Sequence, residues 1–168
     1  MLNHPSVDCR PYERPWRDWA VDRNLDDQWL ECLNNLETFS LVSICEGHID
    51  VKPTSVKRRP CIILSPKVAY RRPITKRWYD LKKPLAAEIE KIWPGGDTIV
   101  EFEIQHRLVK NDDGLEDIED IIIRITSERK RDMMILPEWI HHWFRQALLR
   151  IEAFDRFMKT LIIIRGEQ

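Results

Sequence analysis

Apolar and polar positions along the chain follow helical and extended periods in turn. Leucine and tryptophan recur at intervals of three or four residues between Leu25 and Leu36, which predicts a first helix over about residues 25–37. Two short segments, 39–45 and 60–65, are rich in apolar and β-branched residues. This composition, without a helical period, is typical of strands.

The middle of the chain repeats the same order. A second apolar stripe with helical spacing runs from Trp78 to Ile92 and is interrupted by Pro84. Because an interior proline removes an amide donor and clashes with the preceding turn, we expect either a kink there or a helix whose main body begins there. Strict alternation from Val100 to Leu108 then predicts a strand with one apolar and one charged face.

The last third completes the pattern. Turn residues at 111–114 lead into a second alternating run, 121–126, which suggests a hairpin. A long amphipathic helix is predicted from Pro137, and the apolar run 161–164 is either the end of that helix or a short last strand. The order predicts an α+β fold, a two-layer sandwich in which an antiparallel sheet of about four strands has helices packed on one face.

The first residues follow neither period. Prolines, arginines and tryptophans crowd the segment 1–24, so we expect an irregular arm. Because Trp16 and Trp19 are costly to leave in water, the arm is expected to lie across the domain or a partner subunit. With 168 residues and 43% apolar content, the remainder, 25–168, is expected to be a single domain.

Composition bounds the compartment and the class of protein. No apolar run approaches the roughly 18 residues that span a bilayer, and the polar N-terminus lacks the core of a signal peptide, so we expect a cytoplasmic protein without a membrane partner. The cysteines show no close pairing and are interpreted as reduced thiols. No phosphate-binding glycine loop, dinucleotide fingerprint or hydrolase elbow occurs in the sequence.

The net charge of −1 hides a strong internal asymmetry. Between Lys52 and Lys91 there are twelve basic residues and three acids, and between Asp97 and Asp120 there are nine acids and two basic residues. Either the two regions are solvated or neutralise each other, or the basic region forms a surface that contacts phosphates. The candidate phosphate-binding residues are Lys57, Arg58, Arg59, Arg71 and Arg72.

The densest chemistry lies in the turn after the first strand, Cys45-Glu46-Gly47-His48. An imidazole beside a thiol stabilises the reactive thiolate, so Cys45 and His48 are a candidate nucleophile and base, with Glu46 orienting the histidine. The alternative, which base rates favour because cysteine is among the most buried residue types, is that Cys45 is a buried apolar residue before a polar turn.

A cysteine and a histidine at this spacing are also half of a zinc site. The further ligands would come from Cys61, His106, Cys9 or His4. No second close pair of ligands exists, so no cofactor is predicted, and zinc stays an alternative. His106 falls on the apolar face of its strand, where a core histidine is expected.

Residues 33–36 and 39–48, with the apolar strand 61–64, resemble uncharacterised prokaryotic and phage proteins in which a helix precedes a serine-cysteine-x-glycine-histidine turn. More faintly, the segment is similar to the tRNA wybutosine-synthesis methyltransferase family, whose turn reads serine-cysteine-serine-glycine-arginine. Here Ile44 separates the serine from the cysteine, and His48 stands in place of the arginine. The resemblance implies that the turn is a recurring unit with functional residues.

Two classes of function follow. The first is an enzyme or binding protein that acts on a nucleotide or a nucleic acid at the Cys-Glu-Gly-His turn, with basic residues holding the phosphates. The second is a non-catalytic protein that binds a protein partner or a second copy through the tryptophan-rich arm and its charged faces. The sequence leaves open whether the chain is an enzyme.

Overall fold

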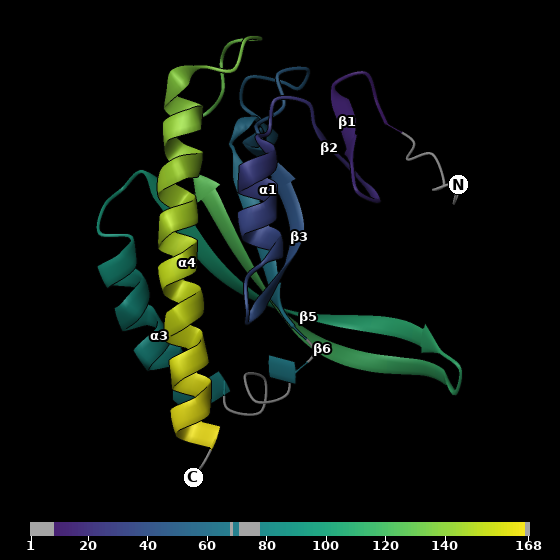
Figure 1. Ribbon diagram of the computed structural model, residues 1–168, viewed down its shortest axis with the longest axis vertical. Coiled ribbons are helices and arrows are strands. Elements are labelled where there is room, and N and C mark those ends of the chain that lie inside the picture. The colour runs from purple at the N-terminus through teal and green to yellow at the C-terminus, as the bar shows by residue number, and fades with distance from the viewer. Residues whose placement is uncertain (1–8, 68, 71–77, 167–168) are drawn as a thin grey trace.

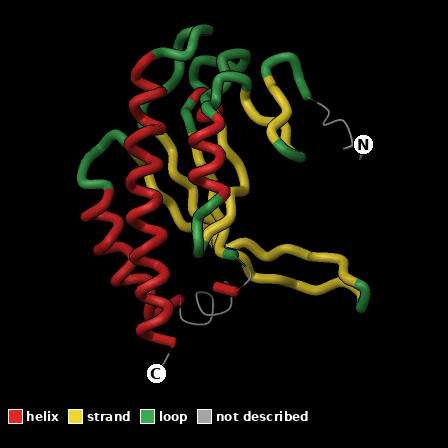
Figure 2. The backbone as a smooth tube through the Cα atoms, viewed as in Figure 1, coloured by secondary structure: helices red, strands yellow, loops and turns green. Residues whose placement is uncertain are grey.

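The computed structural model describes residues 9–67, 69–70 and 78–166, and it confirms the α+β fold. Four antiparallel strands form the main sheet in the order β3-β4-β6-β5. They are β3 (Phe39–Cys45), β4 (Cys61–Pro66), β5 (Thr98–Asn111) and β6 (Gly114–Ser127). Helices α1 (Asp27–Asn34), α3 (Trp78–Ile92) and α4 (Glu138–Gly166) lie on one side of this sheet (Figures 1 and 2).

The core fills the layer between the helices and the sheet. Phe154 of α4 is fully buried and stacks on Phe39 of β3, with 5.6 Å between the ring centroids. The next helix residue, Asp155, accepts hydrogen bonds from the backbone N–H groups of Glu37 and Thr38, each at 2.9 Å, and from the Thr38 hydroxyl. The start of β3 is therefore fixed to α4 by both apolar and charged contacts. Among the described helices, none has an apolar stretch long enough to cross a membrane.

A β-bulge in β3 changes which side chains face the helices. Phe39 and Leu41 point into the core, but the register with β4 shifts between Leu41 and Ser43. After the shift Ile44 is buried instead, and Cys45 lines a pocket on the open face of the sheet. Because an extra residue reverses the alternation of a strand, the bulge places Cys45 outside the core.

The helices differ from expectation at particular residues. Helix α3 runs continuously from Trp78 to Ile92 with Pro84 inside it, so the alternative in which its main body begins at Pro84 is wrong. Residues 161–164 belong to α4, and the alternative of a last strand is also wrong. The first helix is shorter than predicted, because Asp26 caps it by accepting a hydrogen bond from the Gln28 N–H at 2.8 Å.

The N-terminal segment is more regular than predicted. Strands β1 (Glu13–Trp16) and β2 (Trp19–Asp22) pair antiparallel, so the expectation of an irregular arm is wrong for these residues. Arg17 takes a left-handed conformation in the tight turn, with φ 53°. Trp16 and Val21 are buried in the same core as the main sheet. Four-residue strands are too short to show an alternating pattern, which is why the sequence did not reveal them.

The hairpin of β5 and β6 is much longer than the sheet that it joins. Of strand β6, only residues 123–126 pair with β4. Residues 104–121 of β5 and β6 therefore continue as a two-stranded ribbon, here named the β5–β6 arm. Figure 1 shows this arm projecting away from the helices. The prediction that His106 is a core residue is wrong, because it lies in the arm with its side chain 62% exposed.

Candidate functional site

The turn after β3 is held in place by the loop before β4. Gly47 has φ +93°, and a Cβ atom at this position would lie 2.5 Å from the Arg58 carbonyl oxygen. The His48 N–H donates to the Lys57 carbonyl oxygen at 2.8 Å. The close approach of two backbone segments therefore requires glycine here.

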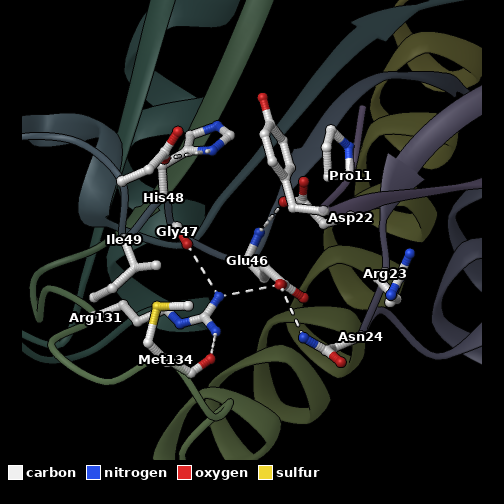
Figure 3. Close-up of a pocket in the computed structure, with 12 residues that line it drawn as sticks. Pro11, Asp22, Arg23, Asn24, Glu46, Gly47, His48, Ile49, Arg131 and Met134 are labelled. Atoms are coloured by element: carbon white, nitrogen blue, oxygen red, sulfur yellow. Dashed lines mark hydrogen bonds and ion pairs between the residues drawn. The ribbon is translucent and has the colours of Figure 1, made fainter. Parts of the chain in front are cut away.

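Glu46 lies in a buried network on the inner side of this turn (Figure 3). Its Oε1 accepts hydrogen bonds from Arg131 Nη1 at 3.0 Å and from Asn24 Nδ2 at 3.1 Å, and its N–H donates to Asp22 Oδ2 at 2.8 Å. The side chains of Glu46 and Arg131 are only 8% and 5% exposed. Both residues therefore act as internal links between β2, β3 and the segment after β6.

Two acids share this network with one arginine, and the pKa of the Glu46 carboxyl lies above its ordinary value. Burial is the main cause and the negative charge of Asp22 the second, while Arg131 and Asn24 act in the opposite direction. The second carboxyl oxygen, Oε2, is buried and has no hydrogen-bond partner among the described residues. A pocket of about 270 Å³ adjoins the network, with Tyr12, His48 and Met134 in its walls.

Two features of the structure bear on the prediction that Cys45 and His48 form a nucleophile and base pair. Burial, followed by the charge of Asp22, raises the pKa of the Cys45 thiol to about 12. In the described structure no hydrogen bond joins Cys45 to the His48 ring, which packs edge-on against Tyr12 with its Nδ1 4.0 Å from Asp50 Oδ1. The thiolate is the reactive form of cysteine, and a raised pKa keeps the thiol protonated. The structure therefore favours the alternative in which Cys45 has a structural role and is not a nucleophile.

A second pocket, of about 640 Å³, lies on the open face of the sheet, opposite the helices, and is here named the open-face pocket. Its floor includes Cys45 and Cys61, which are direct cross-strand partners on β3 and β4. His48 lines both this pocket and the smaller one. The charged residues of its lining are Lys57, Arg59, Arg124 and Glu101.

Two of the three arginine and lysine side chains in the open-face pocket, Lys57 and Arg59, have no acidic partner among the described residues. Arg124 is 3.5 Å from Glu103, but the side chains of Lys57 and Arg59 make no hydrogen bond or ion pair with any described residue. Arg59 is half-buried, and its Nε is fully buried without a partner. Because a buried donor without a partner is costly, Arg59 carries a hydrogen-bonding capacity that no described residue satisfies.

Among the other predicted phosphate-binding residues, Arg58 is described and does not line this pocket. Arg58 donates to the carbonyl oxygens of Val51 at 2.8 Å and Ile49 at 3.2 Å, so its guanidinium is occupied in holding the loop. The single 3₁₀ turn η1 (Val56–Arg58) thus directs Arg58 inward while its neighbours reach the open face. Arg71 and Arg72 lie outside the described residues.

Four of the zinc-ligand candidates, Cys45, His48, Cys61 and His106, divide into two groups. Cys45, Cys61 and His48 line the open-face pocket. Across the sheet, Cys61 pairs with Thr126, and Thr126 pairs with Ile99 of β5. His106 lies seven residues farther along β5 than Ile99. At about 3.4 Å per residue this is roughly 24 Å of strand. Within the described chain no three His, Cys, Asp or Glu side chains are placed to hold a metal ion. The four-ligand zinc site is therefore not formed.

Comparisons with protein-family models, with curated proteins and with solved structures found no match to this chain. The chain is assigned to no family. The resemblance of its serine-cysteine turn stays a prediction, and inferences about function rest on the geometry of the two pockets.

Sequence reasoning missed the residues that come from distant segments. Arg131 follows β6 and reaches Glu46 across 85 positions, with no local motif that marks it. Arg124 carried a signal, because it alternates with buried isoleucines in β6 and so had to face the open side of the sheet. Only the pairing of β6 with β4 brings it beside Cys61 and Arg59.

Proposed function

We propose that the open-face pocket binds the phosphate groups of a nucleotide or of a nucleic-acid strand. The observation that carries the proposal is the pair of unmatched cations, Lys57 and Arg59, in one pocket. A phosphate would supply the acceptors that Arg59 lacks, and charge-assisted hydrogen bonds to arginine are among the stronger polar contacts.

The surroundings of the two cations support the same ligand class. Arg124 and His48 add donors to the lining, and Glu101 is the only acid among the described residues there. A volume of about 640 Å³ falls within the usual range of small-molecule sites, which suits a nucleotide. Exposed sheet surface around the pocket would accommodate a longer strand.

The proposal is for reversible binding and not for covalent catalysis. The Cys45 thiol, with its pKa raised to about 12, is protonated at neutral pH and contributes a polar, uncharged floor. Glu46 faces the other side of the turn, where it holds Arg131. The sequence predicted Cys45, Glu46 and His48 as a candidate catalytic centre. Of these three residues, only His48 lines both pockets and can contact a ligand in either one.

Fluorescence anisotropy with a labelled adenine nucleotide and with a labelled single-stranded oligonucleotide tests the proposal and separates the two ligand types. Replacing Lys57 or Arg59 with Met should weaken binding about 10-fold or more each, since a hydrogen bond to a charged group contributes about 1.5–3 kcal/mol. Affinity for the oligonucleotide should also fall as salt rises, because phosphate contacts release counterions.

Lys91→Met is the matched control, because it removes the same charge from an exposed position on α3, away from the open face. Its affinity should equal that of the wild type. If Lys57→Met and Arg59→Met bound both probes as tightly as Lys91→Met, the proposal would be wrong.

A further inference from the structure

The β5–β6 arm exposes large apolar side chains on the face that continues the core face of the sheet. Ile121 and Ile123 of β6 are buried under the helices, but Leu108 and Leu115, farther along the same face, are each 72% exposed. The strands of the arm have no third strand beside them in the described structure. A two-stranded ribbon is marginal in water, so an arm of this length gains stability when another surface covers it.

Charged residues flank the two leucines in a regular arrangement. In the register of the hairpin, Leu108 is opposite Asp117 and Lys110 is opposite Leu115. Residues two apart and cross-strand partners share a face, so the four side chains form the corners of one patch, about 7 Å along the strands and about 5 Å across them. The leucines occupy one diagonal, and Lys110 and Asp117 occupy the other.

This patch is complementary to itself. A two-fold axis along the Leu108–Leu115 diagonal places each leucine against its own counterpart in a second copy. The same rotation places Lys110 against Asp117 of the second copy, and Asp117 against its Lys110. The two ribbons then cross at a steep angle, as sheets do in orthogonal packing. A two-fold contact of this kind closes on itself and makes a dimer without further growth.

We propose that the β5–β6 arm is a self-association surface whose occupant is the arm of a second copy of this chain, held by Leu108, Leu115 and reciprocal Lys110–Asp117 ion pairs. The proposal is independent of ligand binding at the open-face pocket. Among the described residues Asp117 has one ion pair, an exposed one with His106 at 3.7 Å, and such pairs contribute little. Four side chains bury much less than the roughly 800 Å² per partner of a standard interface, so the dimer is weak and exchanges.

Cysteine crosslinking detects a weak dimer and reports its geometry. Because Leu108 lies on the axis, the Leu108→Cys variant, treated with a thiol oxidant such as diamide, should form a disulfide-linked dimer on a non-reducing gel. Leu149→Cys is the matched control, since Leu149 is a similarly exposed leucine, at 62%, on α4. It should crosslink no more than the wild type, whose native cysteines set the background.

Charge reversal in the Leu108→Cys protein tests the ion pairs. Lys110→Asp alone and Asp117→Lys alone should each reduce crosslinking several-fold, and the two together should restore it. All these positions are exposed, so circular dichroism should show an unchanged fold. Crosslinking of Leu108→Cys no greater than that of Leu149→Cys would overturn the proposal, and so would a double reversal that fails to restore crosslinking.

Discussion

Arg131 joins three parts of the chain through one guanidinium group. It donates to the Glu46 carboxylate and to the Gly47 carbonyl oxygen at 3.2 Å, and also to the carbonyl oxygens of Met133 and Met134. Its backbone N–H donates to the Arg58 carbonyl oxygen at 2.8 Å. The turn that first suggested an active site is therefore, on its inner side, a structural junction.

Replacing Arg131 with Met should destabilise the fold by about 3–5 kcal/mol, because it leaves the buried Glu46 carboxylate without its charged partner. Urea denaturation followed by tryptophan fluorescence measures the change. Arg145→Met is the control, since Arg145 is exposed and, among the described residues, pairs with exposed Glu138 alone, so its loss should change the stability by less than about 0.5 kcal/mol. Equal stabilities for the two variants would contradict this role of Arg131.

Gly47→Ala should destabilise the fold by about 1–3 kcal/mol through a strained backbone, with a further penalty from the collision with the Arg58 carbonyl oxygen. Gly95→Ala is the control, because a Cβ atom there meets nothing within 4 Å and the backbone is not left-handed. Thermal melts of the two variants give the comparison. A Gly47→Ala protein that melts with the wild type would show that the loop can move aside.

Glu46 should make stability depend on pH in a defined direction. Its pKa is raised in the folded state above the ordinary value of 4.5, so the folded protein binds this proton more tightly than the unfolded chain does. The stabilisation from that proton is present at low pH and is lost as the pH rises above 4.5 through the folded pKa. Urea denaturation of wild type and Glu46→Gln from pH 4.5 to 7.5 should show wild type losing stability relative to the variant. A constant difference, or one of opposite slope, would contradict the assignment.

Among the elements, β3 shows what the sequence could and could not predict. Its bounds, 39–45, are confirmed, because a short apolar run with flanking polar residues is a strong local signal. Continued alternation from Phe39 and Leu41 would bury Ser43 and Cys45, and only the bulge against β4 turns both toward the open-face pocket. A bulge is set by the partner strand, so the position of Cys45 could not be read from its own segment.

The β1–β2 hairpin should contribute to the stability of the whole domain. Because Trp16 is buried in the common core and packs edge-on against Trp19, Trp16→Ala should cost about 3–5 kcal/mol of stability, as for other buried aromatic side chains. Val56→Ala, at an exposed position, should be nearly neutral. Urea denaturation measures the free energy of unfolding of the two variants. A small effect at Trp16 would mean that the hairpin is an appendage and not part of the domain.

For the whole molecule, the separation of charge along the sequence has two structural outcomes. Part of the basic region supplies Lys57 and Arg59 to the open face, while part of the acidic region forms the β5–β6 arm, which projects from the body (Figure 1). The α+β class and the hairpin could be predicted, since both rest on local periodicity. The open-face pocket could not, because it is assembled by the pairing of β4 with β3 and β6.

The most direct test of the central claim is a nuclear magnetic resonance titration of isotope-labelled protein with an adenine nucleotide, following each backbone amide. Binding at the open-face pocket predicts shifts that cluster at Lys57, Arg59, Cys61 and Arg124 and that saturate together, with little change in α1 and α4. Arg59→Met should abolish most of them. If the nucleotide shifted no amides, or shifted only those of the helical layer, the open-face pocket would not be the binding site.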